Sequence, residues 1–333
     1  MKKKIFITGG SGFIGSHLVE KCVKLGYTVK TLVPYNVDNT FGWIDNLDKK
    51  ITDNVEVILG DICDSNLFKK ETKKIDVIFH LAALISIPYS YKSPKSYINT
   101  NINGTLNGLE ATRDNNVELF VNTSTSEVYG SAQYVPIDEK HPLNAQSPYA
   151  ASKIAADQLS LSYYRSFGLP VTILRPFNTF GPRQSQRAAI PAIINQIISG
   201  KKKIKLGNLN AYRDFTYVDD TVNGFIKLIG NKKAIGEVIN LGTGTCFSIK
   251  ETLGYICKIL NKKIEVELDQ KRLRPIKSEV NKLLSKNTKA KRILKWKPKF
   301  SGKIGFYNGL EKTIEWFEKN KDLSKNRSDS YNV

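Results

Sequence analysis

The sequence predicts an α/β fold with a doubly wound parallel sheet and a smaller, discontinuous C-terminal domain. Short β-branched runs alternate with helical patterns through the first half of the chain, and parallel strands require crossover connections of this kind. Beyond residue 175 the pattern changes to loop-rich segments that contain Pro176, Pro182 and Pro191. We therefore expect the first half to form the sheet and the second half to add a separate unit.

The expected strands of the sheet are residues 5–8, 28–33, 55–59, 77–81, 119–123 and 171–174. A helix is expected at residues 190–199, and a strand-like run at residues 236–241 is expected to return to the main sheet. We assign residues 1–175, rejoined by about 219–245, to a first domain and residues 176–333 mainly to a second. The tail from Lys319, rich in Lys, Asn, Asp and Ser, is expected to be a weakly ordered surface segment.

The composition indicates a folded protein without membrane spans. An apolar fraction of 41% and an aromatic fraction of 10% are ordinary for a globular chain, which argues against disorder. The apolar run after Lys4 is too short for an export signal, and no run approaches the roughly 18 apolar residues of a membrane span. The four cysteines, at positions 22, 63, 246 and 257, have no C-x-x-C spacing, so we expect reduced packing residues and no metal site. A cytoplasmic location is expected.

The formal net charge of +20 is compatible with nucleic acid, an anionic membrane or an acidic small substrate. Lysines are spread along the chain, with tight clusters only at residues 2–4 and 201–203. No basic helix alternates with aromatic residues as single-strand binders require. We expect a solvated surface on which arginines bind a pyrophosphate, and we predict neither a nucleic-acid nor a membrane partner.

Three glycines are spaced as G-x-x-G-x-x-G directly after the first strand, at Gly9, Gly12 and Gly15. The absence of Cβ lets the backbone turn sharply and approach a pyrophosphate. The following helix, expected to begin at about Phe13 with Ile14 in its first turn, offers N–H groups and the positive end of its dipole. The motif predicts a dinucleotide-binding first domain.

The end of the second strand leaves the cofactor choice partly open. Many dinucleotide folds have a carboxylate there for the adenosine ribose, but this chain has Val-Pro-Tyr-Asn at residues 33–36 and no Arg or Lys before Lys49. Asn36 could bond a ribose hydroxyl or be a turn residue after Pro34. We favour NAD, with NADP as the alternative.

Residues at the ends of the next strands complete the predicted cofactor site. Asp61, beside Ile62, could accept a hydrogen bond from the adenine amino group or cap the next helix. We interpret His80 as a core histidine. Leu81, Ala82 and Ala83 follow it, and the small side chains there would let the cofactor backbone approach closely. The predicted cofactor site also includes the hydroxyl of Thr123 at the end of the fifth strand.

Tyr149 and Lys153 are four residues apart and share one face if this segment is helical. Ser147 and Pro148 favour a helix start just before them. A tyrosine with an ordinary pKa of about 10 is a poor base at neutral pH. A neighbouring ammonium and a positive nicotinamide would lower that pKa, so the pair predicts proton transfer to or from an alcohol.

The segment 123–130 follows the fifth strand at the carboxyl edge of the sheet, where ligands bind. The hydroxyls of Thr125 and Ser126 can hydrogen-bond the alcohol that is oxidised. Glu127 is the informative residue, because a carboxylate at this place can remove a proton α to a new ketone, which oxidation alone does not require. The alternative is that Glu127 faces solvent in a loop.

Together these features resemble the extended short-chain dehydrogenase/reductase superfamily, in its nucleotide-sugar epimerase/dehydratase branch. The resemblance extends through residues 175–184 and 213–215 to Arg274 and Pro275. It implies a Rossmann-like fold, a homodimer, and a catalytic triad of Thr125, Tyr149 and Lys153. It also implies contacts to the cofactor or the nucleotide sugar from Ser86, Pro176, Asn178, Leu206, Arg213 and Arg274, the two arginines being suited to bidentate pairing with phosphate.

Within that branch, residues 36–43, 83–91, 272–275 and 278–280 look like the N-acetylglucosamine 4,6-dehydratases of the legionaminic-acid pathway. By this resemblance Tyr149 would take the O4 proton while hydride leaves C4. Glu127 would then remove the C5 proton as water departs from C6. Hydride returned to C6 would yield a 4-keto-6-deoxy sugar, with UDP or GDP as the carrier.

Three alternatives remain open. Several hexose dehydratases have Asp-Glu where this chain has Ser126 and Glu127; the Ser-Glu form is similar to GDP-mannose dehydratases and also to UDP-glucuronate decarboxylases. The decarboxylases have an Arg shortly before the catalytic tyrosine, whereas this chain has Gln146. A C4 epimerase would need the same triad but no C5 base. A nucleotide-sensing or RNA-binding protein that lost the chemistry is the alternative outside enzymes.

Overall fold

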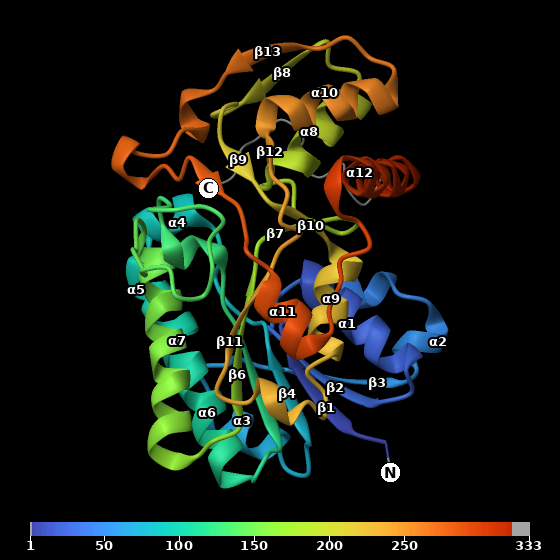
Figure 1. The fold of residues 1–333 in the computed structure, drawn as a ribbon. Coiled ribbons are helices and arrows are strands. Elements are labelled where there is room, and N and C mark those ends of the chain that lie inside the picture. The colour runs from blue at the N-terminus through green and yellow to red at the C-terminus, as the bar shows by residue number, and fades with distance from the viewer. Residues whose placement is uncertain (1, 322–333) are drawn as a thin grey trace.

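The computed structural model describes residues 2–321, and its centre is a seven-stranded parallel sheet (Figure 1). The strands lie in the order β11-β6-β5-β4-β1-β2-β3. Their bounds are β1 Lys4–Thr8, β2 Thr28–Val33, β3 Val55–Leu59, β4 Val77–His80, β5 Leu119–Thr123, β6 Val171–Pro176 and β11 Val238–Leu241. The predicted α/β fold is confirmed, and the strand limits differ from the expected ones by two residues at most.

Helices cover both faces of this sheet because alternate residues of its buried strands point to opposite sides. Ile5 and Ile7 of β1 pack in the cluster that contains Leu18 of helix α1 and Phe225 of helix α9. Phe6, between them, packs in the cluster on the other face. The helices of the first face are α1 Phe13–Lys24 and α9 Val218–Ile226, and those of the second are α3 Ser65–Glu71, α6 Gly104–Asp114 and α7 Pro148–Phe167.

The C-terminal part of the chain, as far as residue 321, builds three small sheets above the carboxyl edge of the main one (Figure 1). They are β7 with β10, β12 with β9 and β14, and β8 with β13. Their bounds are β7 Asn178–Phe180, β8 Lys203–Leu206, β9 Tyr212–Arg213, β10 Phe215–Tyr217, β12 Phe247–Ser248, β13 Glu265–Leu268 and β14 Lys282–Leu283. Helices α8 Ala189–Ile198, α10 Ile249–Leu260, α11 Thr288–Leu294 and α12 Gly302–Lys319 accompany them.

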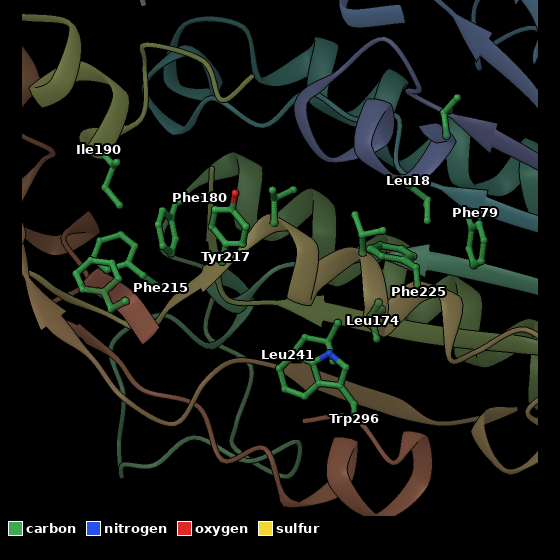
Figure 2. Close-up of a cluster of buried hydrophobic side chains, with 14 of the residues drawn as sticks. Leu18, Phe79, Leu174, Phe180, Ile190, Phe215, Tyr217, Phe225, Leu241 and Trp296 are labelled. Carbon is green, nitrogen blue, oxygen red and sulfur yellow. The ribbon is translucent and has the colours of Figure 1, made fainter. Parts of the chain in front are cut away.

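One apolar cluster joins the two parts. Phe180 and Phe215 pack with their ring centres 6.1 Å apart, and Phe79 of the main sheet packs on Phe225 of α9 at 5.6 Å. Figure 2 shows these side chains as parts of one continuous core. The shared core fixes the C-terminal sheets over the carboxyl edge of the main sheet. The strand order of that sheet reverses between β1 and β4, and doubly wound folds bind ligands at such a point.

Several expectations from the sequence need correction or stay open. Cys22 is buried as expected, but Cys63 is exposed in the loop after β3, so it is not a packing residue. All four cysteines are free. The domain limit near residue 175 stays a prediction, although β11 lies beside β6. Most of the tail from Lys319 lies outside the described residues. Within residues 2–321, no helix is long and apolar enough to cross a membrane.

Candidate active site

The glycine motif forms the turn between β1 and α1. Gly9 has a φ of +76°, and a Cβ there would lie 2.9 Å from the backbone N of Ala82. A Cβ on Gly15 would collide with the carbonyl of Gly9. Gly12 is the N-cap of α1 and brings no capping side chain, and the first N–H groups of a helix have no partner within it. This cradle fits a pyrophosphate.

The ends of β4 and β5 continue the predicted cofactor site. The Thr8 hydroxyl accepts the N–H of Ala82 at 3.1 Å and contacts Nδ1 of His80 at 3.0 Å. Burial lowers the pKa of His80 to about 3, so the neutral ring is a core residue, as expected. At the end of β5, Oγ1 of Thr123 is buried and has no hydrogen-bond partner among residues 2–321. An orphaned hydroxyl at the carboxyl edge of the sheet, two strands from β1, fits a dinucleotide.

The two residues proposed for the adenosine end form local turns in this structure. The Asn36 amide donates to the carbonyls of Pro34 and Thr40, and its Oδ1 accepts the N–H of Thr40. Oδ1 of Asp61 accepts the N–H of Cys63 at 2.9 Å. The cap of α3 is Asp64, so the alternative role of Asp61 as a helix cap is wrong.

Tyr149 and Lys153 lie on the buried face of α7, whose N-cap is Ser147 with Pro148 as the first helical residue. They are 7% and 4% exposed. Burial raises the pKa of Tyr149, while a hydrogen bond from Thr125 lowers it and the charge of Glu127 raises it further. Burial lowers the pKa of Lys153 to about 8. The protein's own groups thus do not produce the lowered tyrosine pKa that the sequence suggested.

Glu127 is the second residue of the short helix η3 (Ser126–Tyr129), and its N–H donates to the hydroxyl of the N-cap Thr125. Its Oε2 pairs with Nη1 of Arg274 at 3.2 Å, and its side chain is 12% exposed. The alternative that Glu127 faces solvent is therefore wrong. Because Glu127 also acts on the pKa of Tyr149, the carboxylate, the phenol and the arginine belong to one site.

A second carboxylate joins this cluster. Glu279 lies 3.8 Å from Nη2 of Arg213, which is 6% exposed. Burial lowers the pKa of Arg213, and Glu127 and Glu279 raise it. Burial would lower the pKa of Arg274 as well, but the same two carboxylates raise it above its ordinary value. Two arginines thus face two glutamates, a set of charges that an anionic ligand can rearrange.

Further predicted residues come from several elements. Asn178, on β7, has a buried Oδ1 without a partner within residues 2–321. Pro176 ends β6 beside Leu241. Ser86 is the N-cap of helix α4 (Ile87–Lys92), and its carbonyl accepts the hydroxyl of Tyr97. Ser126 and Leu206 are buried, the latter at the end of β8. The described residues contain no group of three potential metal ligands.

Comparison with known proteins identifies the family. Residues 6–308 match the family model described as GDP-mannose 4,6 dehydratase. A UDP-N-acetyl-alpha-D-glucosaminuronate decarboxylase of Bacillus cytotoxicus is 33% identical, over 95% of this chain and 98% of the relative. The chain belongs to the extended short-chain dehydrogenase/reductase family of NAD-dependent nucleotide-sugar epimerases and dehydratases.

Two solved structures of this family hold NAD. UDP-glucuronic acid 4-epimerase from Bacillus cereus, in complex with UDP-glucuronic acid and NAD, is 30% identical with a TM-score of 0.84, covering 95% of this chain and 99% of that one. dTDP-glucose 4,6-dehydratase from Bacillus anthracis, in complex with NAD, is 30% identical with a TM-score of 0.82, covering 96% and 98%. These members of the family carry out different reactions at nearly equal identity, so similarity does not select the reaction.

The structure adds site residues to this family member that the sequence analysis did not assign. The segment that contains Arg274 contacts α4, where the hydroxyls of Tyr91 and Ser278 are hydrogen-bonded, and Gln146 also holds it in place. The Gln146 amide donates to the carbonyl of Lys277 at 2.7 Å and accepts the N–H of Ser131. Ser278 donates to the carbonyl of Gln146 at 2.5 Å. The one signal in the sequence for this positioning role was Gln146, which stands shortly before Tyr149 where the decarboxylases have an arginine.

Proposed function

We propose that the protein is a nucleotide-sugar 4,6-dehydratase that uses NAD to convert UDP- or GDP-N-acetylglucosamine to the 4-keto-6-deoxy sugar. The observation that supports it is the carboxylate of Glu127, which lies two residues after Thr125 and is close enough to Tyr149 to raise its pKa. Elimination across C5 and C6 needs a base for the C5 proton, whereas inversion at C4 does not.

In the proposed reaction Tyr149 takes the proton of the C4 hydroxyl. Thr125, already hydrogen-bonded to Tyr149, holds the same oxygen, and the Lys153 ammonium stabilises the phenolate. Bound NAD supplies a reversible acceptor for the C4 hydrogen, and its positive nicotinamide ring favours the phenolate form of Tyr149. The burial of both catalytic side chains keeps water from competing for these protons.

Glu127 then removes the C5 proton, which the C4 ketone has made acidic. The same carboxylic acid can protonate the departing C6 hydroxyl, so that one water leaves and Glu127 returns to its charged form. The hydride taken from C4 is then returned to C6, and C5 takes up a proton from solvent, which balances the O4 proton that Tyr149 took and later releases to solvent. This step requires Glu127 to be released from Arg274. We propose that the diphosphate of the substrate takes over Arg274 together with Arg213, because charge-assisted bidentate pairing favours phosphate.

The rival reactions differ in what they require of named residues. A C4 epimerase would use Tyr149 and Lys153 and would not depend on Glu127. A decarboxylase should offer a cation to the C6 carboxylate before the tyrosine, but Gln146 is neutral and its amide is bonded to Lys277 and Ser131. We therefore favour dehydration. The choice of N-acetylglucosamine and of a place in legionaminic-acid synthesis rests on the resemblance of residues 36–43, 83–91, 272–275 and 278–280.

The proposal is tested by incubating the NAD-loaded protein with UDP- and GDP-N-acetylglucosamine. We expect mass spectrometry to find a product lighter by one water with one of the two. A product of unchanged mass that is a C4 stereoisomer by NMR would replace dehydration with epimerisation. Tight RNA binding with a steep salt dependence, and no sugar turnover, would favour the non-enzymatic alternative.

We also propose a homodimer. Ile98, Ile102 and Leu106 recur at four-residue spacing along the π-helical turn η2 (Ile98–Asn103) and the adjoining α6, and Ile98 is 51% exposed. Such spacing places the three side chains on one side of consecutive helical turns. Sedimentation of wild-type protein and of Ile98→Asp tests this contact: a dimer that the substitution leaves intact would rule it out.

A further inference from the structure

A buried ion pair lies one helical turn beyond Lys153 on α7. Asp157 is fully buried, and its Oδ2 accepts hydrogen bonds from Nε and Nη2 of Arg175 at 3.0 and 2.9 Å. Oδ2 also accepts the hydroxyl of Ser124 at 2.8 Å, and Oδ1 accepts the amide of Asn122 at 3.0 Å. The carboxylate thus ties α7 to β5 and β6.

The arginine of this pair is held as firmly as the carboxylate. Arg175 is 2% exposed, and its Nη1 donates to the hydroxyl of Tyr129 at 2.8 Å. That hydroxyl donates to Oδ1 of Asn240 at 2.8 Å, and the guanidinium carbon lies 5.0 Å from the centre of the Tyr129 ring. Buried ion pairs are costly to desolvate and often add little to stability, so another reason for retaining this one is needed.

The position of Asp157 supplies a reason. It follows Lys153 by four residues on the same face of α7. Its partner Ser124 directly precedes Thr125, whose hydroxyl is bonded to Tyr149. One carboxylate therefore contacts both elements that carry the catalytic groups, the helix with Tyr149 and Lys153 and the end of β5 that leads to Thr125.

We propose that Asp157, held by Arg175, is a positioning residue that fixes α7 against the end of β5 and sets the electrostatic potential at Lys153 and Tyr149. This inference rests on the proposed roles of Tyr149 and Lys153, which are common to the dehydratase and the epimerase. It does not depend on Glu127 or on which sugar is bound.

The charges around the pair agree with this assignment. Burial lowers the pKa of Lys153 and Asp157 raises it. Burial raises the pKa of Tyr149. Glu127 of η3, Tyr97 of the short helix α5 (Pro94–Tyr97) and Asp157 raise it further. His80 of β4 has its pKa lowered to about 3 by burial and by Lys153, so it is neutral at physiological pH. Beside Arg175, Glu139 acts on Tyr129.

Opposite charge changes should move the pH profile in opposite directions. Asp157→Asn removes a negative charge, which disfavours the Lys153 ammonium and favours the Tyr149 phenolate. Both pKa values fall, and both limbs of the kcat profile should move to lower pH by about one unit. Arg175→Gln leaves Asp157 uncompensated, so both limbs should move to higher pH. Glu315→Gln, which changes an exposed charge on α12, should move neither limb.

A second readout does not need a sugar substrate. In the NAD holoenzyme, the phenolate of Tyr149 can be titrated by ultraviolet difference spectroscopy, each variant being compared with the same variant carrying Tyr149→Phe. The midpoint should fall in Asp157→Asn and rise in Arg175→Gln. Because no turnover is required, this result stands or falls separately from the dehydration assay.

Either single substitution leaves a buried charge unpaired and could unfold the protein, so thermal unfolding is measured alongside. The double variant Asp157→Asn/Arg175→Gln removes both charges of this buried pair, so neither is left without its partner. It should fold and still show lowered midpoints, by less than Asp157→Asn, because Asp157 is the member of the pair that acts on Lys153. The proposal is overturned if the limbs of the kcat profile and the Tyr149 titration midpoints stay in place, or if they move in the same direction in both single variants. Asp157 would then have a structural role only.

Discussion

Replacing Glu127 by glutamine should make the free enzyme bind a nucleotide diphosphate more tightly, although it should abolish dehydration. In the structure Arg274 is already engaged by Glu127. A diphosphate that uses Arg274 must displace this carboxylate. The substituted amide side chain would keep the shape of the glutamate but lose the charge that competes with phosphate.

The size of the effect follows from the geometry of the pair. Nη1 of Arg274 and Oε2 of Glu127 are 3.2 Å apart, and at an effective dielectric constant of about 20 two unit charges at this distance attract by about 5 kcal/mol. Both side chains retain contact with water, at 22% and 12% exposure, so solvation of the freed carboxylate returns most of that energy. We expect a net gain of about 1–2 kcal/mol, which is a roughly five- to thirtyfold rise in affinity.

The assay is calorimetric titration of the NAD holoenzyme with UDP at low ionic strength. Arg274→Gln should weaken UDP binding, and the double variant Glu127→Gln/Arg274→Gln should lose the gain of the single one, which gives the coupling energy of the pair. The gain should shrink as salt is added. Equal or weaker UDP binding by Glu127→Gln would refute the idea that the diphosphate and Glu127 exchange on Arg274.

Three further outcomes are expected. The value of kcat should decline above about pH 8, where Lys153 loses its proton, and a steady rate to pH 10 would show that the ammonium is not required. Gly9→Ala should raise the dissociation constant for NAD at least about tenfold, because the new Cβ would lie 2.9 Å from the Ala82 backbone at a φ of +76°; fluorescence titration measures it. Gln146→Ala should raise KM and spare kcat, because it frees Lys277 and the Arg274 segment.

The parts of the molecule that depend on local pattern were predictable from the sequence. The strands at 28–33, 55–59 and 119–123 match the structure residue for residue. Short runs rich in β-branched and aromatic residues, bounded by turn residues, strongly favour strands. The Tyr149 helix was predicted by its Ser147 cap and Pro148. These signals lie within a few residues of the feature they specify.

Contacts between distant segments were not predictable in the same way. Glu127 and Arg274 are 147 residues apart in sequence and were assigned separate tasks, and no local pattern indicated that they pair. The amide of Asn36 was open to two interpretations, and in the structure it bonds its own loop. The place of Asp157, one helical turn after Lys153, was a sequence signal for a role near the site. Its partner Arg175 lies on a separate strand, and the sequence alone does not show that the two side chains meet.

The most direct test of the account follows the C5 proton. The NAD-loaded enzyme is incubated in deuterium oxide with whichever nucleotide N-acetylglucosamine it accepts, and the product is analysed by NMR and mass spectrometry. If Glu127 removes the C5 proton and loses it with the departing water, the 4-keto-6-deoxy product will carry one solvent deuterium at C5, and Glu127→Gln will form none of it. A product with only protium at C5, or turnover that survives Glu127→Gln, would contradict the central claim.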